Sequence, residues 1–437
     1  MIGRREKKES IGILLYNWIS KNFFIHRSLG GKGNIKFLNS LKQINKKLKI
    51  KKFKSGSNVY DWKVPSVWEL NRSYIKHSSG KIYADSRESN INIVQYSIPV
   101  KTKLTKNQLL KKIYSLPKQP NLVPYVTSYY KKDWGFCMKH SEKKKLPNGY
   151  YSVFIDSVFK KDGLPYGELY IKGKTKKEIL FSTYICHPSM ANNELSGPAV
   201  SIFLSKFIEK NFKNNYYSYR FIYIPETIGS IAYIKKNLKN LKKNVFCAFN
   251  LTCVGDERMI SMVKSRKADA ISDFALESLL INEKNKKIFS FLDRGSDERQ
   301  FCSPGVDIDM SVFCRSKFGE YKEYHTSADN LNLVSPKGLE VSIKKLEKMV
   351  EVFEIGIFPK TNNLCEPHLT KYNLYESLSI KTSYKLNFNK KILDFLAYSD
   401  GKKNVFELAV LLNIKIEDLL KILKILLEKK LILIKYK

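Results

Sequence analysis

The pattern of apolar positions changes twice along the chain. Residues 1–48 carry apolar side chains at helical spacing, whereas residues 53–115 form short alternating runs broken by Gly and Pro, typical of β-strands. From about residue 150, near-continuous apolar runs alternate with amphipathic segments. Strands that are covered on both faces have this continuous apolar character. The pattern therefore predicts an α/β domain with a mainly parallel or mixed sheet and helices on both faces.

The C-terminal part follows a different pattern. A long amphipathic helix is predicted for residues 339–357, and the irregular segment 361–382, rich in Asn, Ser and Thr around Pro367, is predicted to be a linker. Residues 383–437 contain apolar runs at helical spacing and end in a short strand-like run. They predict a small, mainly helical domain.

Composition places the chain among globular proteins of two or three domains. It has 437 residues, of which 43% are hydrophobic and 13% aromatic. The seven cysteines form no C-x-x-C pair, which favours a reducing compartment and hence a cytoplasmic location. No apolar run approaches the roughly 18 residues that a membrane span needs, so no membrane partner is expected.

The formal net charge of +37 has two interpretations. It could mark binding to nucleic acid or to an anionic membrane. However, the lysine-rich runs at 46–54, 143–145 and 174–177 are scattered and show no repeated aromatic or arginine spacing. A solvated, lysine-rich surface is therefore favoured over a nucleic-acid partner.

Polar residues recur where predicted strands end. His187, Glu226 and Asp297 each follow a strand-like run, as does the segment 250–256, and His325 lies in a later loop. Binding groups in α/β sheets gather beyond the carboxyl ends of strands. A single histidine is more often a packed core residue, but this recurrence favours a site. Imidazole and carboxylate groups are the ligands of hydrolytic zinc sites.

Two neighbouring acidic groups leave alternatives open. Asp297 and Glu298, followed by Arg299, could start a helix with a local ion pair or could line a pocket. Asp329, four residues after His325, could orient the imidazole or cap a helix.

Eight segments together carry a resemblance to a known family. They are S-G-S-N-V-Y-D-W-K-V-P (55–65), P-Y-V-T-S-Y-Y-K-K-D-W-G-F-C (124–137), Y-G-E-L (166–169), C-H-P-S-M-A-N-N-E-L-S-G (186–197), P-E-T-I-G-S (225–230), C-V-G-D (253–256), G-S-D-E-R-Q-F-C-S-P-G (295–305) and Y-H-T-S-A-D-N-L (324–331). The chain resembles M28-type zinc aminopeptidases. It is more closely similar to the aminopeptidase-like family with the labels DUF4910 and DUF2172 and a C-terminal winged helix.

The resemblance implies a zinc-exopeptidase-like (phosphorylase/hydrolase-like) mixed sheet with three attached parts. The aminopeptidase-like α/β domain is expected at residues 1–48 and 116–360, with an inserted β-rich DUF2172 domain at 49–115. A linker at 361–382 and a winged-helix domain at 383–437 complete the expected organisation.

The resemblance also implies the metal ligands. M28-type enzymes bind two zinc ions that share a bridging aspartate, and this pattern places His187 and His325 as the histidine ligands. The bridging aspartate falls on Asn193 and the aspartate of the second metal on Thr252. Because an amide oxygen is neutral and binds Zn²⁺ more weakly than a carboxylate, a single ion is expected, held by His187 and His325. Its third ligand is Asn193, Glu226 or Asp297. Glu194 is a nearby carboxylate that could replace Asn193.

The expected catalytic residues are Glu226, Asp297 and Glu298. Glu226 falls where the resemblance places the general base, and the other two fall at the rim of the pocket. The favoured function is metal-dependent, aminopeptidase-like hydrolysis of an amide in a small peptide or an aminoacyl or sugar conjugate, since relatives are associated with polysaccharide biosynthesis.

Two alternatives stay open. The chain could be a catalytically degenerate binding or scaffold protein, or a regulator that binds DNA through its winged helix. The apolar spacing of residues 415–430, without an arginine on a free face, favours a docking or dimer module, and hence a homo-oligomer, over DNA binding.

Overall fold

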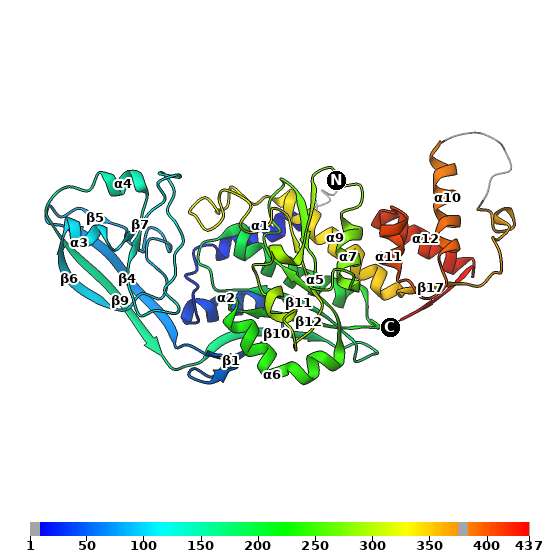
Figure 1. Cartoon of the computed structure of the whole chain (residues 1–437), viewed down its shortest axis with the longest axis horizontal. Helices are drawn as coiled ribbons and strands as arrows, with labels where there is room; N and C mark the ends of the chain where they lie inside the picture. Colours follow the sequence, from blue (N-terminus) through cyan, green and yellow to red (C-terminus); the bar gives the residue numbers. More distant parts are fainter. Residues whose placement is uncertain (1–8, 375–382, 437) are drawn as a thin grey trace, which may run out of the picture.

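The structure is a computed structural model that describes residues 9–374 and 383–436. Its centre is an eight-stranded sheet with the order β1-β10-β12-β11-β13-β16-β14-β15 (Figure 1). The strands are β1 (Lys49–Phe53), β10 (Leu164–Ile171), β11 (Glu178–Tyr184), β12 (Ser218–Ile224), β13 (Val245–Leu251), β14 (Ile260–Val263), β15 (Lys286–Phe289) and β16 (Met310–Cys314). The four central strands β12, β11, β13 and β16 run parallel. β10 pairs antiparallel with β1 and β12, and β14 pairs antiparallel with β16 but parallel with β15. The predicted mixed sheet is confirmed.

Successive side chains of the central strands point to opposite faces, and each face has its own core. Ile179 and Phe181 of β11 join one apolar cluster, whereas Leu180 between them joins the other. The first face is covered by α1 (Ile11–Asn22), α2 (Lys32–Ile44), α5 (Ser196–Asn211), α7 (Ile271–Leu279) and α9 (Pro336–Ile355). The second is covered by α6 (Ile228–Asn244) and the short α8 (Glu298–Phe301). Helices on both faces explain why the strands read as continuous apolar runs.

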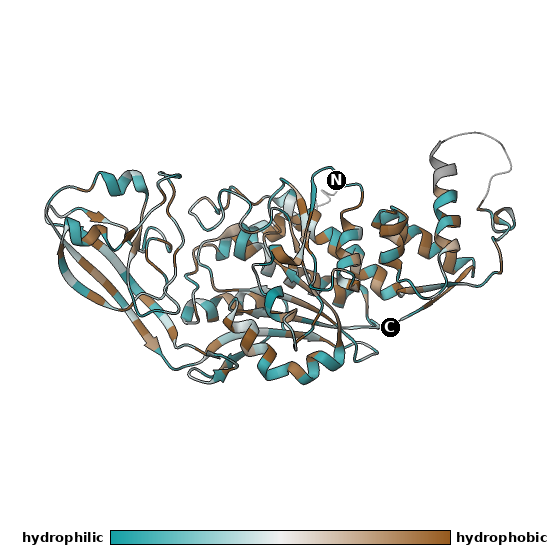
Figure 2. Cartoon of the chain, in the orientation of Figure 1, coloured by the Kyte–Doolittle hydropathy of each residue, from teal (hydrophilic) through white to brown (hydrophobic). Residues whose placement is uncertain are grey.

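A second sheet lies at the end of the molecule opposite the C-terminal helices (Figure 1). Its order is β5-β4-β9-β6, with β4 (Val67–His77), β5 (Ile82–Tyr83), β6 (Val100–Thr105) and β9 (Tyr150–Lys160). Hydrophobic and hydrophilic residues alternate along its strands (Figure 2). The apolar face packs around Trp68, Tyr151 and Val153. Shorter elements complete this region, namely β2 (Asn58–Val59), β3 (Trp62–Lys63), α3 (Lys106–Leu110), β7 (Ile113–Tyr114), β8 (Phe136–Cys137) and α4 (His140–Lys144).

The strand pairing moves both boundaries of the expected inserted domain. β1, which begins at residue 49, pairs with β10 in the main sheet. β9, which lies far beyond residue 115, pairs with β4 and β6 in the second sheet. The expected limits 49–115 therefore differ from the second sheet at both ends, because the local pattern of a strand does not indicate which partner it pairs with.

The C-terminal helices share a core with the α/β domain. β17 (Phe358–Thr361) pairs antiparallel with β18 (Ile432–Lys435), and α10 (Ser383–Ala397), α11 (Val405–Leu411) and α12 (Ile416–Glu428) lie between them in the chain. The ring of Phe406 in α11 lies 4.8 Å from that of Phe353 in α9. The segment expected to be a linker at 361–382 thus begins on a strand, and its residues 375–382 lie outside the described residues.

The helices and the cysteines can be compared with what the composition predicts. No helix among them combines the length and the apolar character that a membrane crossing requires. All seven cysteines are free thiols, six of them buried, and only Cys365 is exposed.

Candidate active site

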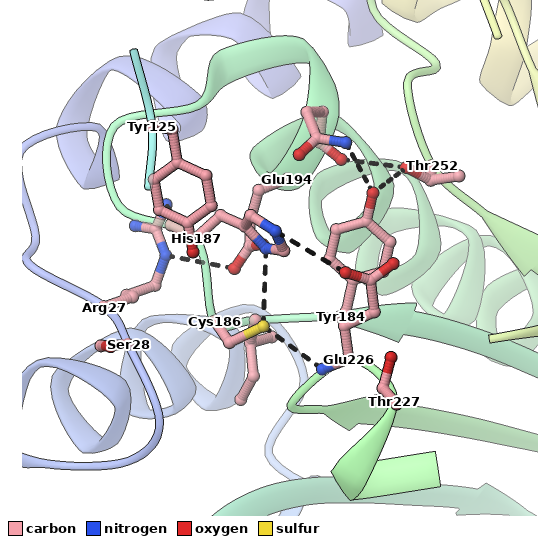
Figure 3. Close-up of polar contacts among 12 residues, drawn as sticks. Arg27, Ser28, Tyr125, Tyr184, Cys186, His187, Glu194, Glu226, Thr227 and Thr252 are labelled. Atoms are coloured by element: carbon pink, nitrogen blue, oxygen red, sulfur yellow. Dashed lines mark hydrogen bonds and ion pairs between the residues drawn. The ribbon is translucent and has the colours of Figure 1, made fainter. Parts of the chain in front are cut away.

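Three adjacent parallel strands place the predicted residues at their carboxyl ends, on the same side of the main sheet. His187 follows β11, Glu226 follows β12 and Thr252 follows β13 (Figure 3). His325 comes from the loop between β16 and α9, and its ring centroid lies 5.2 Å from that of His187. The structure therefore brings together the two histidines and the glutamate that were singled out in the sequence.

Glu194 and Arg27 hold the His187 side chain in place. Glu194 lies on the π-helical turn Ala191–Leu195, and its Oε2 is 2.7 Å from His187 Nδ1. Arg27 Nε lies 3.6 Å from Glu194 Oε1, and Arg27 also donates to the His187 carbonyl at 2.9 Å. The side chains of Arg27 and Glu194 are both fully buried. Glu194 thus orients His187 from the Nδ1 side, instead of replacing Asn193 as the sequence had suggested.

The charges around the two histidines differ. Burial on its own would lower the pKa of His187, but Cys186 and Glu194 outweigh it and the pKa lies well above its ordinary value. Glu226 Oε2 is 3.6 Å from His187 Nε2, so carboxylates flank this ring on both sides. Burial, and then the neighbouring His187, lower the pKa of His325 well below its ordinary value. His325 is therefore a neutral imidazole, whereas the environment of His187 favours its protonated, positively charged form.

Two neutral side chains stand where the M28 pattern has aspartates. Asn193 Nδ2 donates to Tyr184 Oη at 2.7 Å, and Thr252 Oγ1 lies 2.5 Å from the same oxygen. The Thr252 hydroxyl donates to the Asn193 carbonyl at 3.0 Å. This network joins β11, β13 and the π-helical turn without any carboxylate, so it contributes no anionic metal ligand.

Asp329 fixes the π-helical turn, and no contact joins it to the His325 ring. Its carboxylate accepts hydrogen bonds from the backbone N–H groups of Asn192 at 2.6 Å and Asn193 at 3.0 Å, and from Tyr321 Oη at 2.8 Å. Of the two alternatives for this residue, the contacts therefore favour capping of a helical turn. The consequence for the site is that Asn193 is anchored through its own backbone.

Glu226 sits on a strained turn. The following Thr227 has φ 62° and ψ −76°, and Ile228 N–H donates to the Glu226 carbonyl at 2.7 Å, which closes a γ-turn. Such a conformation is rare for a β-branched residue and persists only where neighbours hold it. Arg299 donates to Thr227 Oγ1 at 2.6 Å. About a fifth of the Glu226 side chain is exposed, and burial raises its pKa.

The contacts of Asp297 and Glu298 are structural. Asp297 Oδ1 accepts from the backbone of Thr227 at 2.8 Å and from the Ser230 hydroxyl at 2.9 Å, at the start of α6. Glu298 Oε1 accepts from the backbone of Gly295 and Ser296. Both residues are fully buried. These bonds hold the Glu226 turn and its neighbouring loop, and the catalytic roles of Asp297 and Glu298 stay predictions.

Sequence reasoning missed Arg27 and the aromatic residues around the histidines. The ring of Tyr125 lies 4.9 Å from that of His187 and 5.1 Å from that of His325, and Tyr324 stacks on His325 at 3.9 Å. Arg27 stands 160 residues before His187 in the chain. Tyr125 lies in the segment 124–137, one of those that carry the family resemblance, but no local signal pairs Arg27 with Glu194.

The chemistry of the donor atoms near the two histidines suits a zinc ion. His325 Nε2 and Asn193 Oδ1 are buried and have no hydrogen-bond partner. Cys186, His187 and Glu194 also bring ligand atoms within 4.8 Å of one another. That group is a poor metal site, because Glu194 is engaged by Arg27 and burial raises the pKa of the Cys186 thiol to about 11. Two imidazole nitrogens and an amide oxygen are acceptable zinc donors.

Comparison with known proteins assigns the family. The model of a domain of unknown function, DUF4910, matches residues 16–356. The chain belongs to the DUF4910 family. A winged helix-turn-helix model matches residues 357–433, which includes β17, so the winged helix starts before the expected residue 383. The assignment of the insert to DUF2172 stays a prediction.

Similar proteins share the whole architecture. A "putative polysaccharide biosynthesis protein with aminopeptidase-like domain" from Clostridium acetobutylicum is 36% identical over 397 residues, 90% of either chain. A crystal structure of a "putative peptidase" from the same organism is 34% identical, with a TM-score of 0.87, and covers 97% of this chain and 96% of that one.

More distant structures share the fold. BSAP, a zinc aminopeptidase from Bacillus subtilis, has 15% identity and a TM-score of 0.57 over 79% of this chain and 95% of its own. A peptidase M28 precursor from Shewanella amazonensis has 11% identity and a TM-score of 0.55 over 79% of this chain and 93% of its own. At these identities the likeness establishes an aminopeptidase-like fold.

The buried Asp297 makes stability depend on pH. Burial, and then Glu226, raise its pKa from 3.8 to about 8, so between these values the native state holds a proton that the unfolded chain releases. The free energy of unfolding is therefore expected to fall as pH rises through this range.

Asp297→Asn keeps an acceptor for Thr227 and Ser230 but does not titrate. Urea denaturation of chelator-treated protein measures the free energy of unfolding from about pH 6 to about pH 9. The free energy of unfolding of the variant should rise relative to that of the wild type as pH increases. If the free energies of unfolding of the two proteins changed with pH in the same way, the raised pKa of Asp297 would be contradicted.

Proposed function

We propose that this protein is an aminopeptidase-like amide hydrolase that uses a single zinc ion. The observation that supports the proposal is the group of donor atoms at the end of the sheet. His325 Nε2 and Asn193 Oδ1 lack hydrogen-bond partners, and His187 Nε2 faces the Glu226 carboxylate. Leaving buried polar atoms unpaired is costly, and both atoms are free to act as donors to a metal ion.

One ion is favoured over two by the charges. A second ion would need further anionic ligands, whereas Asn193 and Thr252 are neutral and bonded to Tyr184. Glu194 is turned to the opposite nitrogen of His187 and is neutralised by Arg27. With zinc bound, the bond to Glu194 would keep the imidazole proton on Nδ1 and leave Nε2 to the metal, as carboxylates do for metal-binding histidines.

Glu226 is the residue best placed to move a proton. A bound Zn²⁺ would lower the pKa of water and polarise an amide carbonyl. Glu226 lies beside His187 Nε2 and is partly exposed, and its raised pKa brings it nearer to neutral pH. In the proposed reaction Glu226 takes the proton from the attacking water and passes it to the leaving nitrogen. Arg299 and Asp297 hold the turn that presents it.

The substrate is proposed to be a small peptide or an aminoacyl or sugar conjugate. The aminopeptidase-like neighbours support an amide at the terminus of a small molecule, and the name of the relative from Clostridium acetobutylicum supports a role in polysaccharide biosynthesis. The rings of Tyr125 and Tyr324 pack against those of the two histidines.

A binding or scaffold function is the second candidate. It is favoured by Asn193 and Thr252, which remove two carboxylates of the M28 pattern. A DNA-binding role is less well supported, because α12 lies against α9 through the ion pair Lys348–Glu417 and the apolar core that both helices share. This arrangement supports a docking role for the winged helix.

Metal content tests the site directly. The wild type should hold about one zinc per chain, because one set of three neutral donors binds one ion. His187→Ala and His325→Ala should each remove the zinc, as measured by elemental analysis of protein reconstituted with Zn²⁺. His368→Ala, which changes an exposed histidine, is the matched control and should keep it. A zinc-free wild type would overturn the hydrolase and leave the scaffold function as the leading one.

Glu194 should tune the affinity for zinc. Glu194→Gln keeps the size of the side chain but removes the charge that holds the imidazole of His187. The dissociation constant for Zn²⁺, from competition with a chromophoric chelator, should rise roughly 10- to 100-fold. Glu277→Gln, which breaks a partly exposed ion pair with Lys264, is the control. An unchanged affinity would show that the Glu194 contact is purely structural.

Glu226 should matter for turnover and not for folding. Glu226→Gln should lower kcat on aminoacyl-p-nitroanilides by roughly 10²- to 10⁴-fold, because a general base contributes about that factor. The zinc content and the thermal unfolding temperature should stay close to those of the wild type. A variant that retains full activity would exclude Glu226 as the base.

A further inference from the structure

A cleft between the second sheet and the loop 124–133 opens beside the candidate active site. Its volume is about 460 Å³, and aromatic rings form much of its lining. They are Tyr96, Tyr129, Tyr130 and Phe159. Because these residues come from three separate segments, the cleft exists only in the folded chain.

The aromatic rings are held in a fixed arrangement. The ring of Tyr96 lies 4.9 Å from Phe159 and 5.7 Å from Tyr129, both nearly perpendicular to it. The Tyr96 hydroxyl donates to the Ser66 carbonyl at 2.8 Å. Tyr130 is nevertheless 71% exposed and Phe159 is 39% exposed. Grouped aromatic surface that stays open to solvent is typical of a ligand-binding surface.

The cleft is connected to the candidate active site through two tyrosines. Tyr129 Oη lies 3.1 Å from Tyr125 Oη, and the Tyr125 ring contacts both His187 and His325. Tyr129 thus belongs both to the lining of the cleft and to the group of side chains around the histidines.

Positive charge borders the aromatic rings. Lys131 and Lys132 line the cleft, and both are exposed. The nearby Asp133 is already paired with Lys112 at 2.6 Å. Neither Lys131 nor Lys132 has a carboxylate within ion-pair distance in the part of the chain that the structure describes. Two ammonium groups are thus available to an anionic ligand.

We propose that this cleft is a binding subsite for an acidic sugar, such as a hexuronic acid. The C–H face of a pyranose ring stacks on aromatic rings, and its carboxylate pairs with ammonium groups. A purely apolar peptide side chain would leave the two lysines unused. The binding itself does not depend on hydrolysis, but its role in selecting a sugar conjugate as substrate rests on the proposed function.

Calorimetric titration with trigalacturonic acid tests the subsite in the full chain. EDTA is present throughout, so binding is measured without metal and a failure of the hydrolase proposal does not affect the result. The wild type should bind, and Lys131→Ala/Lys132→Ala and Tyr130→Ala should each weaken binding at least tenfold. Lys284→Ala/Lys286→Ala removes the same charge at the outer edge of the main sheet, by β15, and should leave binding unchanged.

Two further ligands distinguish the contribution of the carboxylate charge from that of apolar contact with the aromatic rings. The methyl ester of trigalacturonic acid should bind at least tenfold more weakly than the acid, since it lacks the charge. Phe-Phe amide should not compete. Absence of acid binding, equal loss in the Lys284/Lys286 control, or preference for the dipeptide would each overturn the acidic-sugar subsite.

Discussion

The buried contact between Glu194 and His187 sets the geometry of the whole candidate site. A carboxylate from which water is excluded is unfavourable unless a positive group and hydrogen bonds compensate it. Arg27 supplies the charge and His187 Nδ1 supplies the hydrogen bond. Because the same arginine also binds the His187 carbonyl, the loop before α2 is tied to the end of β11. His187 Nε2 is then left to face Glu226.

Backbone constraints assemble the other residues around this contact. Asp329 binds the N–H groups of the π-helical turn and so positions Asn193, while Asp297 and Arg299 hold the strained Thr227 turn that presents Glu226. The carboxylates of Asp329 and Asp297 thus anchor backbone turns of the site. The M28 pattern has aspartates at the positions of Asn193 and Thr252. Here the buried carboxylate is Glu194, which lies on the Nδ1 side of His187.

The two flanking units affect the site differently. The second sheet and the loop 124–133 contribute Tyr125 to the histidine shell, and Tyr125 N–H donates to the His325 carbonyl at 2.8 Å. Access to the histidines therefore depends on a part of the chain outside the α/β domain. The C-terminal helices pack through Phe353 and Phe406 on the opposite side from the second sheet, so they can serve assembly without touching the site (Figure 1).

The sequence by itself determined the α/β class, the helices on both faces and the position of His187 and Glu226 after strands. Strand and helix periodicity are local properties, and parallel strands bring their carboxyl ends to one edge. The sequence did not determine the limits of the second sheet, because β1 and β9 have the same pattern whichever sheet they join. The Arg27–Glu194 pair and the capping role of Asp329 were decided only by the tertiary structure. Each joins residues more than a hundred positions apart, and local sequence does not report such contacts.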